Sequence, residues 1–253
     1  MSNFNDELHT MTLSDDGSYT AYSKEYEEHY HSTKDGALHE SLVKHVLPAF
    51  KEMQDKKSID ILDICYGLGF NTLATIYYHQ QNCLTSKLNI YSPELDASLV
   101  KSLLNFTYPK EFDGFKEIIK ALSEDGVYED KNLYIEVFLG DAREYVRRFE
   151  NKFDIVYQDA FSPSTNPILW TKEYFSDISR AIKEEGVLTT YSIAFKVRLA
   201  LYENGFNLYE NSGEGFRVAT IASKSELKAY KFVNMEHKIS CNKEISSLRD
   251  ESI

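Results

Sequence analysis

The sequence predicts an α/β fold with a doubly wound sheet that is mostly parallel and ends in an antiparallel hairpin. Five times between residues 59 and 204, a short apolar run is followed by a helical segment. A glycine turn directly follows the first apolar run, as expected at the edge of such a sheet. Two last apolar runs, 206–211 and 216–223, flank a Ser-Gly-Glu-Gly turn, which is typical of a hairpin.

The elements are justified in chain order. Residues 1–36 are acidic and tyrosine-rich, and we expect an irregular arm with a short hairpin. An apolar helical stripe starts at Ala37, and Pro48 is expected to kink or end it. The five strands are expected at residues 59–65, 88–92, 133–139, 153–158 and 187–192, and the helices that follow them at residues 70–81, 98–106, 142–149, 171–184 and 193–204. The segment 107–132 is a long insertion. The sequence thus divides into an arm, a main domain at 37–223, and a polar extension at 224–253 that forms a tail or a terminal helix.

Composition limits the function classes. The chain has 253 residues, of which 42% are apolar, so it can bury a sizeable core. Its 40 acidic and 28 basic residues argue against broad nonspecific binding to nucleic acid or anionic lipid, although a locally basic face remains compatible. Three cysteines, no leader-like start and no apolar run long enough to span a bilayer indicate a cytoplasmic protein with reduced thiols and no membrane association. We expect no metal site.

The glycine turn indicates a cofactor site. Residues 63–71 read D-I-C-Y-G-L-G-F-N, and Gly67 and Gly69 let the backbone approach a ligand closely. Thr72 stands where a dinucleotide fingerprint has its third glycine, and Asp63 would repel a pyrophosphate. An acid here suits S-adenosyl-L-methionine, which carries a sulfonium and an ammonium group. The alternative is a glycine turn with Asp63 in a buried network.

Two further acids follow predicted strands. Glu94 comes after the second strand, where a carboxylate can accept hydrogen bonds from both ribose hydroxyls. Asp141 with Ala142 follows the third strand, where they can contact the adenine edge. Asp141 can also cap the helix at 142–149, and Glu94 can be a first-turn helix acid.

The loop after the fourth strand is the most informative stretch. Residues 159–170 read D-A-F-S-P-S-T-N-P-I-L-W. Asp159 is delivered to the carboxyl edge of the sheet, where it can bind a substrate ammonium or take its proton. Phe161 can stack on a nucleobase. The alternative is structural, with Asp159 capping the turn and Trp170 covering the core.

Several segments resemble the methyltransferase domain of the MnmC family of tRNA wobble-uridine enzymes. The family's E-I-G-F-G-T-G-L-N turn is matched by residues 63–71. Its D-[GA]-F-[AS]-P-x-x-N-P-x-x-W segment is matched by residues 159–170, and its V-R-x-x-L and G-F segments are echoed at 197–201 and 205–206. The resemblance extends over about residues 20–222.

The resemblance implies a class I, Rossmann-like methyltransferase that converts 5-aminomethyl-2-thiouridine to 5-methylaminomethyl-2-thiouridine at the tRNA wobble position. The partner would be the anticodon region of tRNA. The family's flavin-dependent half is not matched, so a stand-alone form served by a separate FAD-dependent oxidoreductase is implied. Together with the patterns above, it implies cofactor contacts from Asp63, Tyr66, Gly67, Gly69, Asn71, Glu94, Asp141, Ala142 and Asp159, substrate contacts from Phe161, Pro163, Asn166, Lys196, Arg198 and Arg217, and catalytic roles for Asp159 and Phe161.

The sequence departs from the family at two glycines. Cys65 replaces the first glycine of the turn and is expected to tighten the methionine side of the pocket, and Phe195 stands where a glycine precedes the V-R pair. Two alternatives therefore stay open. One is a methyl- or aminopropyltransferase for a small free amine, and the other is a non-catalytic adaptor with the same fold.

Overall fold

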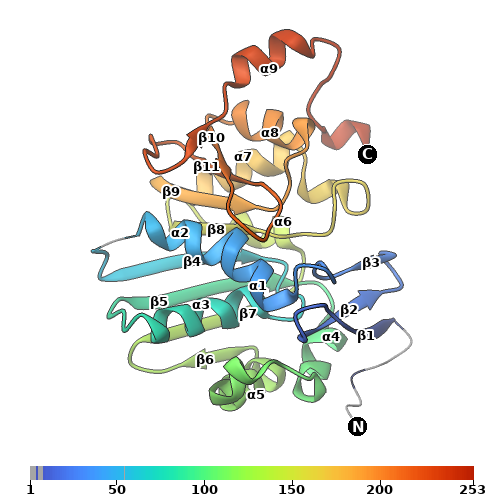
Figure 1. The fold of residues 1–253 in the computed structure, drawn as a ribbon, viewed down its shortest axis with the longest axis vertical. Coiled ribbons are helices and arrows are strands. Elements are labelled where there is room, and N and C mark those ends of the chain that lie inside the picture. Colours follow the sequence, from blue (N-terminus) through green and yellow to red (C-terminus); the bar gives the residue numbers. More distant parts are fainter. Residues whose placement is uncertain (1–3, 5–7, 54) are drawn as a thin grey trace.

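The computed structural model describes residues 4, 8–53 and 55–253, and it shows a central sheet with helices on both faces (Figure 1). Among these residues the sheet has nine strands, in the spatial order β12 (Lys231–Phe232), β10 (Asn207–Asn211), β11 (Ala219–Ser223), β9 (Ile182–Thr190), β8 (Phe153–Gln158), β4 (Ser58–Ile64), β5 (Lys87–Glu94), β7 (Leu133–Leu139) and β6 (Val127–Glu129). The α-helices are α1 (Ala37–Glu40), α2 (Leu47–Lys51), α3 (Phe70–Gln81), α4 (Ala97–Ser102), α5 (Lys116–Asp125), α6 (Ala142–Val146), α7 (Lys172–Ala181), α8 (Phe195–Tyr202) and α9 (Met235–Cys241).

The sheet confirms the predicted fold class. Strands β4, β5, β7, β8 and β9 run parallel, and β10 and β11 form the predicted antiparallel hairpin. The chain leaves β4 toward β5 on one side and later returns to β8 on the other, so the strand order reverses at the β4–β8 pair. Ligands of doubly wound sheets bind outside the carboxyl ends of the strands at such a reversal.

The core has two layers because both faces of the parallel strands are covered. Within β4, Ile61 belongs to the layer under α1, α2, α3 and α5, whereas Leu62 belongs to the layer under α6, α7 and α8. Both side chains are fully buried. This two-sided burial explains why apolar side chains occupy both faces of the strand at Ile61 and Leu62.

The helical stripe at Ala37 is longer than expected. A π-helical segment, Ser41–Val46, connects α1 to α2, and α2 runs through Pro48 to Lys51. Pro48 sits in the first turn of α2, where its missing N–H costs little. The helix therefore does not end at Pro48, and the irregular π-helical turn lies directly before the proline.

Other element ends shift by a few residues. The helix expected at 171–184 stops at Ala181, and β9 begins at Ile182, where it pairs with Phe153. The helix expected at 142–149 ends at Val146. The insertion 107–132 forms a 3₁₀ turn (Lys110–Phe115), then α5 and β6.

The arm forms a small antiparallel sheet of β1 (His9–Leu13), β2 (Tyr19–Ser23) and β3 (Glu28–His29). Residues 1–3 and 5–7 of the expected arm lie outside the described residues. Figure 1 shows the arm beside the end of the molecule where β4 leads into its turn. The arm is thus more regular than expected, and it stands next to the carboxyl ends of the parallel strands.

The polar extension packs against the main domain. β12 pairs with β10, α9 provides the terminal helix that the sequence left open, and Lys172 N–H donates to Leu248 O. Over the described residues, no helix is both long and apolar enough to cross a membrane.

Candidate active site

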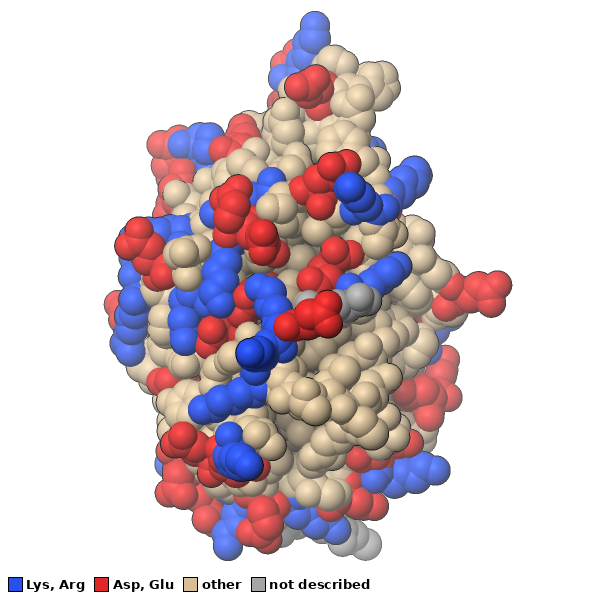
Figure 2. Space-filling view, turned by 90° about the vertical axis from the view of Figure 1, so that its left-hand side faces the viewer, with Lys and Arg blue, Asp and Glu red and all other residues tan. Residues whose placement is uncertain are grey.

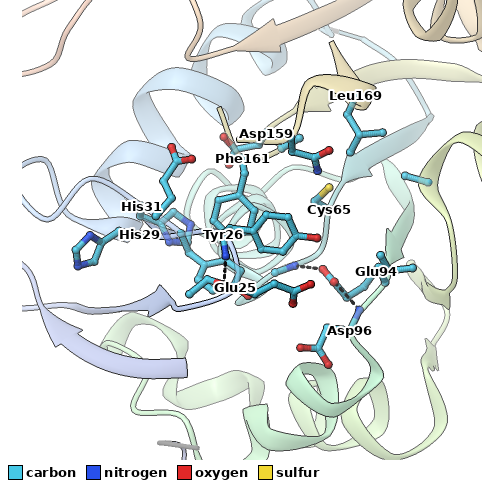
Figure 3. Close-up of a pocket in the computed structure, with 18 of the residues that line it drawn as sticks. Glu25, Tyr26, His29, His31, Cys65, Glu94, Asp96, Asp159, Phe161 and Leu169 are labelled. Carbon is cyan, nitrogen blue, oxygen red and sulfur yellow. Dashed lines mark hydrogen bonds between the residues drawn. The ribbon is translucent and has the colours of Figure 1, made fainter. Parts of the chain in front are cut away.

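A cavity of about 890 Å³ opens at the carboxyl ends of β4, β5, β7 and β8. Its wall comes from the glycine turn, the loops after those strands, the arm, and the β10–β11 hairpin. Figure 3 shows Glu94 and Asp96 on one side, Asp159 and Leu169 on another, and the ring of Tyr26 between them. The cavity therefore lies at the strand reversal, where the topology predicts a ligand.

The glycine turn contributes its backbone to the cavity wall. Gly67 has φ 53° and donates its N–H to Glu94 Oε2 at 2.8 Å. A Cβ on Gly67 would lie 3.1 Å from the Tyr30 ring, so the turn is pressed against the arm. Cys65 also adopts the left-handed region, with φ 65°, and its side chain lines the cavity. A non-glycine residue at this φ is strained.

Other predicted cofactor residues support this wall from behind. Asp63 is buried and accepts a hydrogen bond from Thr72 Oγ1 at 2.8 Å, and burial raises its pKa to about 7. The Tyr66 ring packs under Gly69. A Cβ added to Gly69 would lie 2.7 Å from the Tyr66 hydroxyl. Among the described lining residues, Asp63, Tyr66, Gly69 and Asn71 do not appear. The geometry thus gives Asp63 the buried network that the sequence left open as the alternative, and does not place it beside a cofactor ammonium.

Glu94 faces the cavity at the end of β5. Its carboxylate accepts from the N–H groups of Gly67 and Asp96. Burial raises the pKa of Glu94, although these backbone hydrogen bonds oppose the shift. Asp96 caps α4 by accepting from Ser98 and Leu99, and its side chain also lines the cavity. Glu94 therefore lies on the cavity wall at the end of β5, the strand end where the sequence predicts a contact to the ribose hydroxyls.

Asp141 caps α6 and also lies on the cavity wall. Asp141 Oδ1 accepts from Glu144 N–H at 2.9 Å and so caps α6. Asp141 and Ala142 also line the cavity. The cap fixes the carboxylate at the cavity edge, where its other oxygen stays available to a ligand.

Asp159 is held on both of its oxygens. Asn71 Nδ2 donates to Asp159 Oδ2 at 2.8 Å, and His45 Nε2 lies 3.3 Å from Asp159 Oδ1. Burial alone would raise the pKa of Asp159, but the nearby His45, His31 and Asn71 outweigh burial and lower it. Asp159 therefore stays ionised at neutral pH and presents a fixed negative charge to the cavity.

Aromatic rings cover the cavity beside Asp159. Phe161 stacks on Tyr26 of the arm, with ring centroids 4.6 Å apart and ring planes 20° apart. The Tyr30 ring centroid lies 5.0 Å from the Phe161 ring centroid. Glu28 in β3 accepts from the Ser162 N–H, which ties the arm to this loop. Trp170 is fully buried and donates its indole N–H to Phe161 O, as the structural reading of that residue expects.

The predicted substrate residues divide into two groups. Asn166 and Arg217 line the cavity, whereas Pro163 and Lys196 do not appear among its described lining residues. The expectation for Arg198 needs correction. Its side chain is only 5% exposed and donates from Nε to Thr220 Oγ1, so it does not reach the phosphate of a bound nucleic acid. Valine and leucine neighbours on α8 bury this face of the helix.

Acidic side chains dominate the cavity. Its described lining includes the carboxylates of Glu25, Glu28, Glu40, Glu94, Asp96, Asp141 and Asp159, and among the described lining residues Arg217 is the only Lys or Arg. On the face at the amino ends of the strands, acidic and basic side chains are interspersed (Figure 2). There Lys56 and Lys183 pair with the buried Asp154. The cavity therefore favours a cationic ligand.

Comparison with known proteins identifies the family. Residues 111–226 match a family model described as S-adenosyl-L-methionine-dependent methyltransferase. The crystal structure of MnmC2 from Aquifex aeolicus is similar with a TM-score of 0.83 and 32% identity, covering 98% of this chain and 80% of that one. The chain belongs to the MnmC2-like family of S-adenosyl-L-methionine-dependent methyltransferases. Its cofactor is S-adenosyl-L-methionine.

Two curated relatives of this family extend the comparison. An uncharacterised protein of Methanocaldococcus jannaschii is 32% identical over 227 residues, which are 87% of this chain and 60% of that protein. The bifunctional protein MnmC of Azoarcus sp., named for tRNA 5-methylaminomethyl-2-thiouridine biosynthesis, is 28% identical over 219 residues. That match covers 81% of this chain and 34% of the relative, so the chain spans about a third of the bifunctional protein.

The cavity fits the cofactor of this family. Gly67 brings a bare backbone to the wall, Glu94 and Asp141 supply carboxylates at the ends of neighbouring strands, and the acidic lining suits a sulfonium and an ammonium group. These features are properties of the cavity itself.

Sequence reasoning missed three residues of the site. His45 and His31 flank Asp159, and Tyr26 covers Phe161. His45 lies within an apolar helical stripe and Tyr26 within a tyrosine-rich arm, so only the tertiary contact distinguishes them. The signal that was available is that His45 is a polar residue beside the apolar stripe positions Leu42 and Val46.

Proposed function

We propose that this methyltransferase acts on the primary amine of 5-aminomethyl-2-thiouridine at the wobble position of tRNA and forms 5-methylaminomethyl-2-thiouridine. The observation that carries the proposal is the ionised Asp159 in an acidic, aromatic-walled cavity of an MnmC2-like methyltransferase. The printed name of the Azoarcus relative concerns the same modified nucleoside and supports this choice.

The cofactor would be held by the glycine turn at Gly67, by Glu94 at the ribose, and by Asp141 with Ala142 at the adenine. Cys65 would border its methionine portion. When bound, the cofactor supplies an electrophilic methyl group on a sulfonium centre. The protein's part is alignment and exclusion of water, which supply most of the rate in such a transfer.

Asp159 would orient the substrate amine. An alkylammonium has no lone pair, so it must lose a proton before its nitrogen can bond to carbon. The carboxylate of Asp159, with its lowered pKa, would hold and orient the ammonium, which would then release its proton to solvent water. Phe161 would stack on the flipped-out uracil ring once Tyr26 moves aside.

Further parts of the proposal concern partners. Arg217 at the cavity mouth and the exposed Lys196 are the residues proposed to contact phosphates of the anticodon region. A separate FAD-dependent oxidoreductase would supply the aminomethyl substrate. A tRNA substrate would place the reaction in the cytoplasm.

Mass spectrometry of tRNA nucleosides tests the proposal in cells with and without this gene. We expect 5-methylaminomethyl-2-thiouridine to disappear and its aminomethyl precursor to accumulate when the gene is deleted. An unchanged nucleoside profile would reject the proposed substrate.

The acidic lining also favours a small polyamine as substrate, which is the second candidate. Incubation of the purified protein with methyl-labelled cofactor and either tRNA or a polyamine separates the two. Label in the polyamine alone would favour the second candidate.

A further inference from the structure

Asn71 stands where the glycine turn leads into α3. Gly69 precedes the helix in the left-handed region, with φ 75°, and Asn71 is the second residue of the helix. Thr75 Oγ1 donates to Asn71 O one turn later, at 2.7 Å. The Asn71 side chain is only 5% exposed and does not appear among the described lining residues of the cavity. It therefore lies behind the cavity wall, next to the strand ends.

The amide of Asn71 contacts acidic side chains from two neighbouring strand ends. Its Nδ2 donates to Asp159 Oδ2 at 2.8 Å, directly after β8. A hydrogen bond from Asn71 also acts on Asp63 in β4, where it opposes the rise in pKa that burial causes. Asn71 Oδ1 is buried and accepts no hydrogen bond from a described residue. Since an ionised carboxylate can only accept, the amide must turn its donor toward Asp159.

The amide fixes the direction of the Asp159 carboxylate. Asp159 Oδ2 accepts from Asn71, and Asp159 Oδ1 lies 3.3 Å from His45 Nε2. Contacts on both oxygens hold the plane of the carboxylate. The Asp159 side chain is 14% exposed, so only a small part of it faces the cavity. Loss of the amide would let the carboxylate turn and change which lone pairs reach a ligand.

We propose that Asn71 is a positioning residue that directs the Asp159 carboxylate at the substrate amine, and that it is not a cofactor contact. The inference rests on the proposed function, because it requires an amine next to Asp159. Methyl transfer needs the amine nitrogen in line with the methyl group, and a misplacement of about 1 Å can cost on the order of a hundredfold in rate. One short segment thus serves both ligands, with Gly67 on the cofactor wall and Asn71 behind the amine acid.

A double-mutant cycle tests the inference in single-turnover methyl transfer to tRNA from gene-deleted cells. Asn71→Ala should slow the transfer about three- to tenfold, and by no more than Asp159→Asn does, because it acts only through that carboxylate. The affinities for tRNA and for the cofactor should change less than about twofold. In the Asp159→Asn background, the additional Asn71→Ala change should alter the rate by less than about twofold, since no carboxylate is left to direct.

Two further variants accompany the cycle. Asn71→Ser has a side chain too short to bring its hydroxyl to the position of the amide nitrogen, so it should behave like Asn71→Ala even if the alanine variant folds poorly. Asn82→Ala, at the exposed end of the same helix, is the matched control and should leave rate and affinities unchanged. Thermal unfolding identifies the variants that are folded.

Equal rate losses from Asn71→Ala in the wild-type and Asp159→Asn backgrounds would overturn the inference, because a general structural defect acts in both. So would a loss of cofactor affinity of tenfold or more in Asn71→Ala, measured by calorimetry. If the wild-type protein labels a polyamine and not tRNA, the proposed function fails, and the same cycle measured with the polyamine decides the inference. Absence of methyl transfer to either amine would reject both.

Discussion

At the scale of single residues, the site depends on carboxylates in opposite electrostatic settings. Asp159 is ionised because His45, His31 and Asn71 outweigh its burial, whereas burial raises the pKa of Asp63 to about 7. The two side chains lie at the ends of the neighbouring strands β8 and β4. Their sequence contexts look alike, so only their partners distinguish a ligand-facing acid from a structural one.

The role of Asp159 predicts a selective loss. Asp159→Asn keeps the shape and removes the charge that orients the amine, so methylation should fall at least about tenfold while cofactor binding persists. Single-turnover methyl transfer and calorimetry measure the two quantities. Asp113→Asn, on an exposed turn, serves as the control. An equal loss of cofactor affinity would assign Asp159 to the cofactor.

The raised pKa of Asp63 predicts a pH effect on stability. The folded protein holds the Asp63 proton more tightly than the unfolded chain, so the stability from this group is complete below about pH 4 and is lost as the pH rises toward about 7. Asp63→Asn should therefore flatten this decline, by roughly 2–4 kcal/mol in the free energy of unfolding.

Denaturant unfolding at several pH values measures this effect. Asp154 provides a contrast at the other end of the sheet, because hydrogen bonds from Asp60 N–H, Lys183 and Lys56 outweigh burial and lower its pKa. Asp154→Asn should instead lower the free energy of unfolding at pH values above the usual pKa of an aspartate. A decline of equal slope in wild type and Asp63→Asn would contradict the assignment.

At the scale of elements, the arm determines access to Phe161. Tyr26 occupies one face of the Phe161 ring, and an aromatic pair contributes about 0.5–1.5 kcal/mol. A nucleobase that stacks there must displace Tyr26. Tyr26→Ala should therefore lower KM for tRNA by up to about tenfold.

Steady-state kinetics with the same tRNA measures this change. Tyr22→Ala is the matched control, because Tyr22 lies in the same arm and contacts His29 instead. A rise in KM for Tyr26→Ala would show that Tyr26 itself binds the base.

The C-terminal segment links two loops of the cavity. Arg143, next to Ala142 on α6, makes two hydrogen bonds to Asp250, and Thr171 at the start of α7 donates to the same carboxylate. Asp250→Ala leaves Arg143 without this partner and should destabilise the fold by about 1–2 kcal/mol after allowance for screening at this half-exposed carboxylate.

The same change should weaken cofactor binding, because α6 begins with the Asp141–Ala142 wall of the cavity. Thermal unfolding and cofactor calorimetry measure the two effects. Glu251→Ala, at an exposed neighbouring residue, is expected to change neither. Unaltered stability and cofactor affinity in Asp250→Ala would show that the segment only rests on the surface.

Predictability from the sequence differed between elements for physical reasons. α3 begins and ends at the predicted residues, because Gly69 in the left-handed region directly precedes the helix and no glycine or proline interrupts residues 70–81. β9 begins earlier than predicted, since pairing with Phe153 overrides the helical preference of its charged residues. The arm strands are short and gave no periodic signal. Motifs placed Glu94, Asp141 and Asp159 on the cavity wall, but His45 required the tertiary fold.

At the scale of the whole molecule, charge and topology converge on one end. The net charge is −12, and carboxylates gather in the cavity at the carboxyl ends of the strands. Such a field attracts a cationic cofactor and a cationic amine, while it repels the phosphates of RNA. Under the proposed function, recognition of tRNA would therefore rely on local contacts at the cavity, where Arg217 lies.

The most direct test of the account is methyl transfer in a defined mixture. Purified protein is incubated with methyl-deuterated S-adenosyl-L-methionine and tRNA from gene-deleted cells, and the digested nucleosides are resolved by mass spectrometry. The account predicts a deuterated methyl group on the aminomethyl nitrogen of the wobble 2-thiouridine and on no other nucleoside. A labelled methyl group at another atom, or no label in tRNA while the protein binds the cofactor, would contradict it.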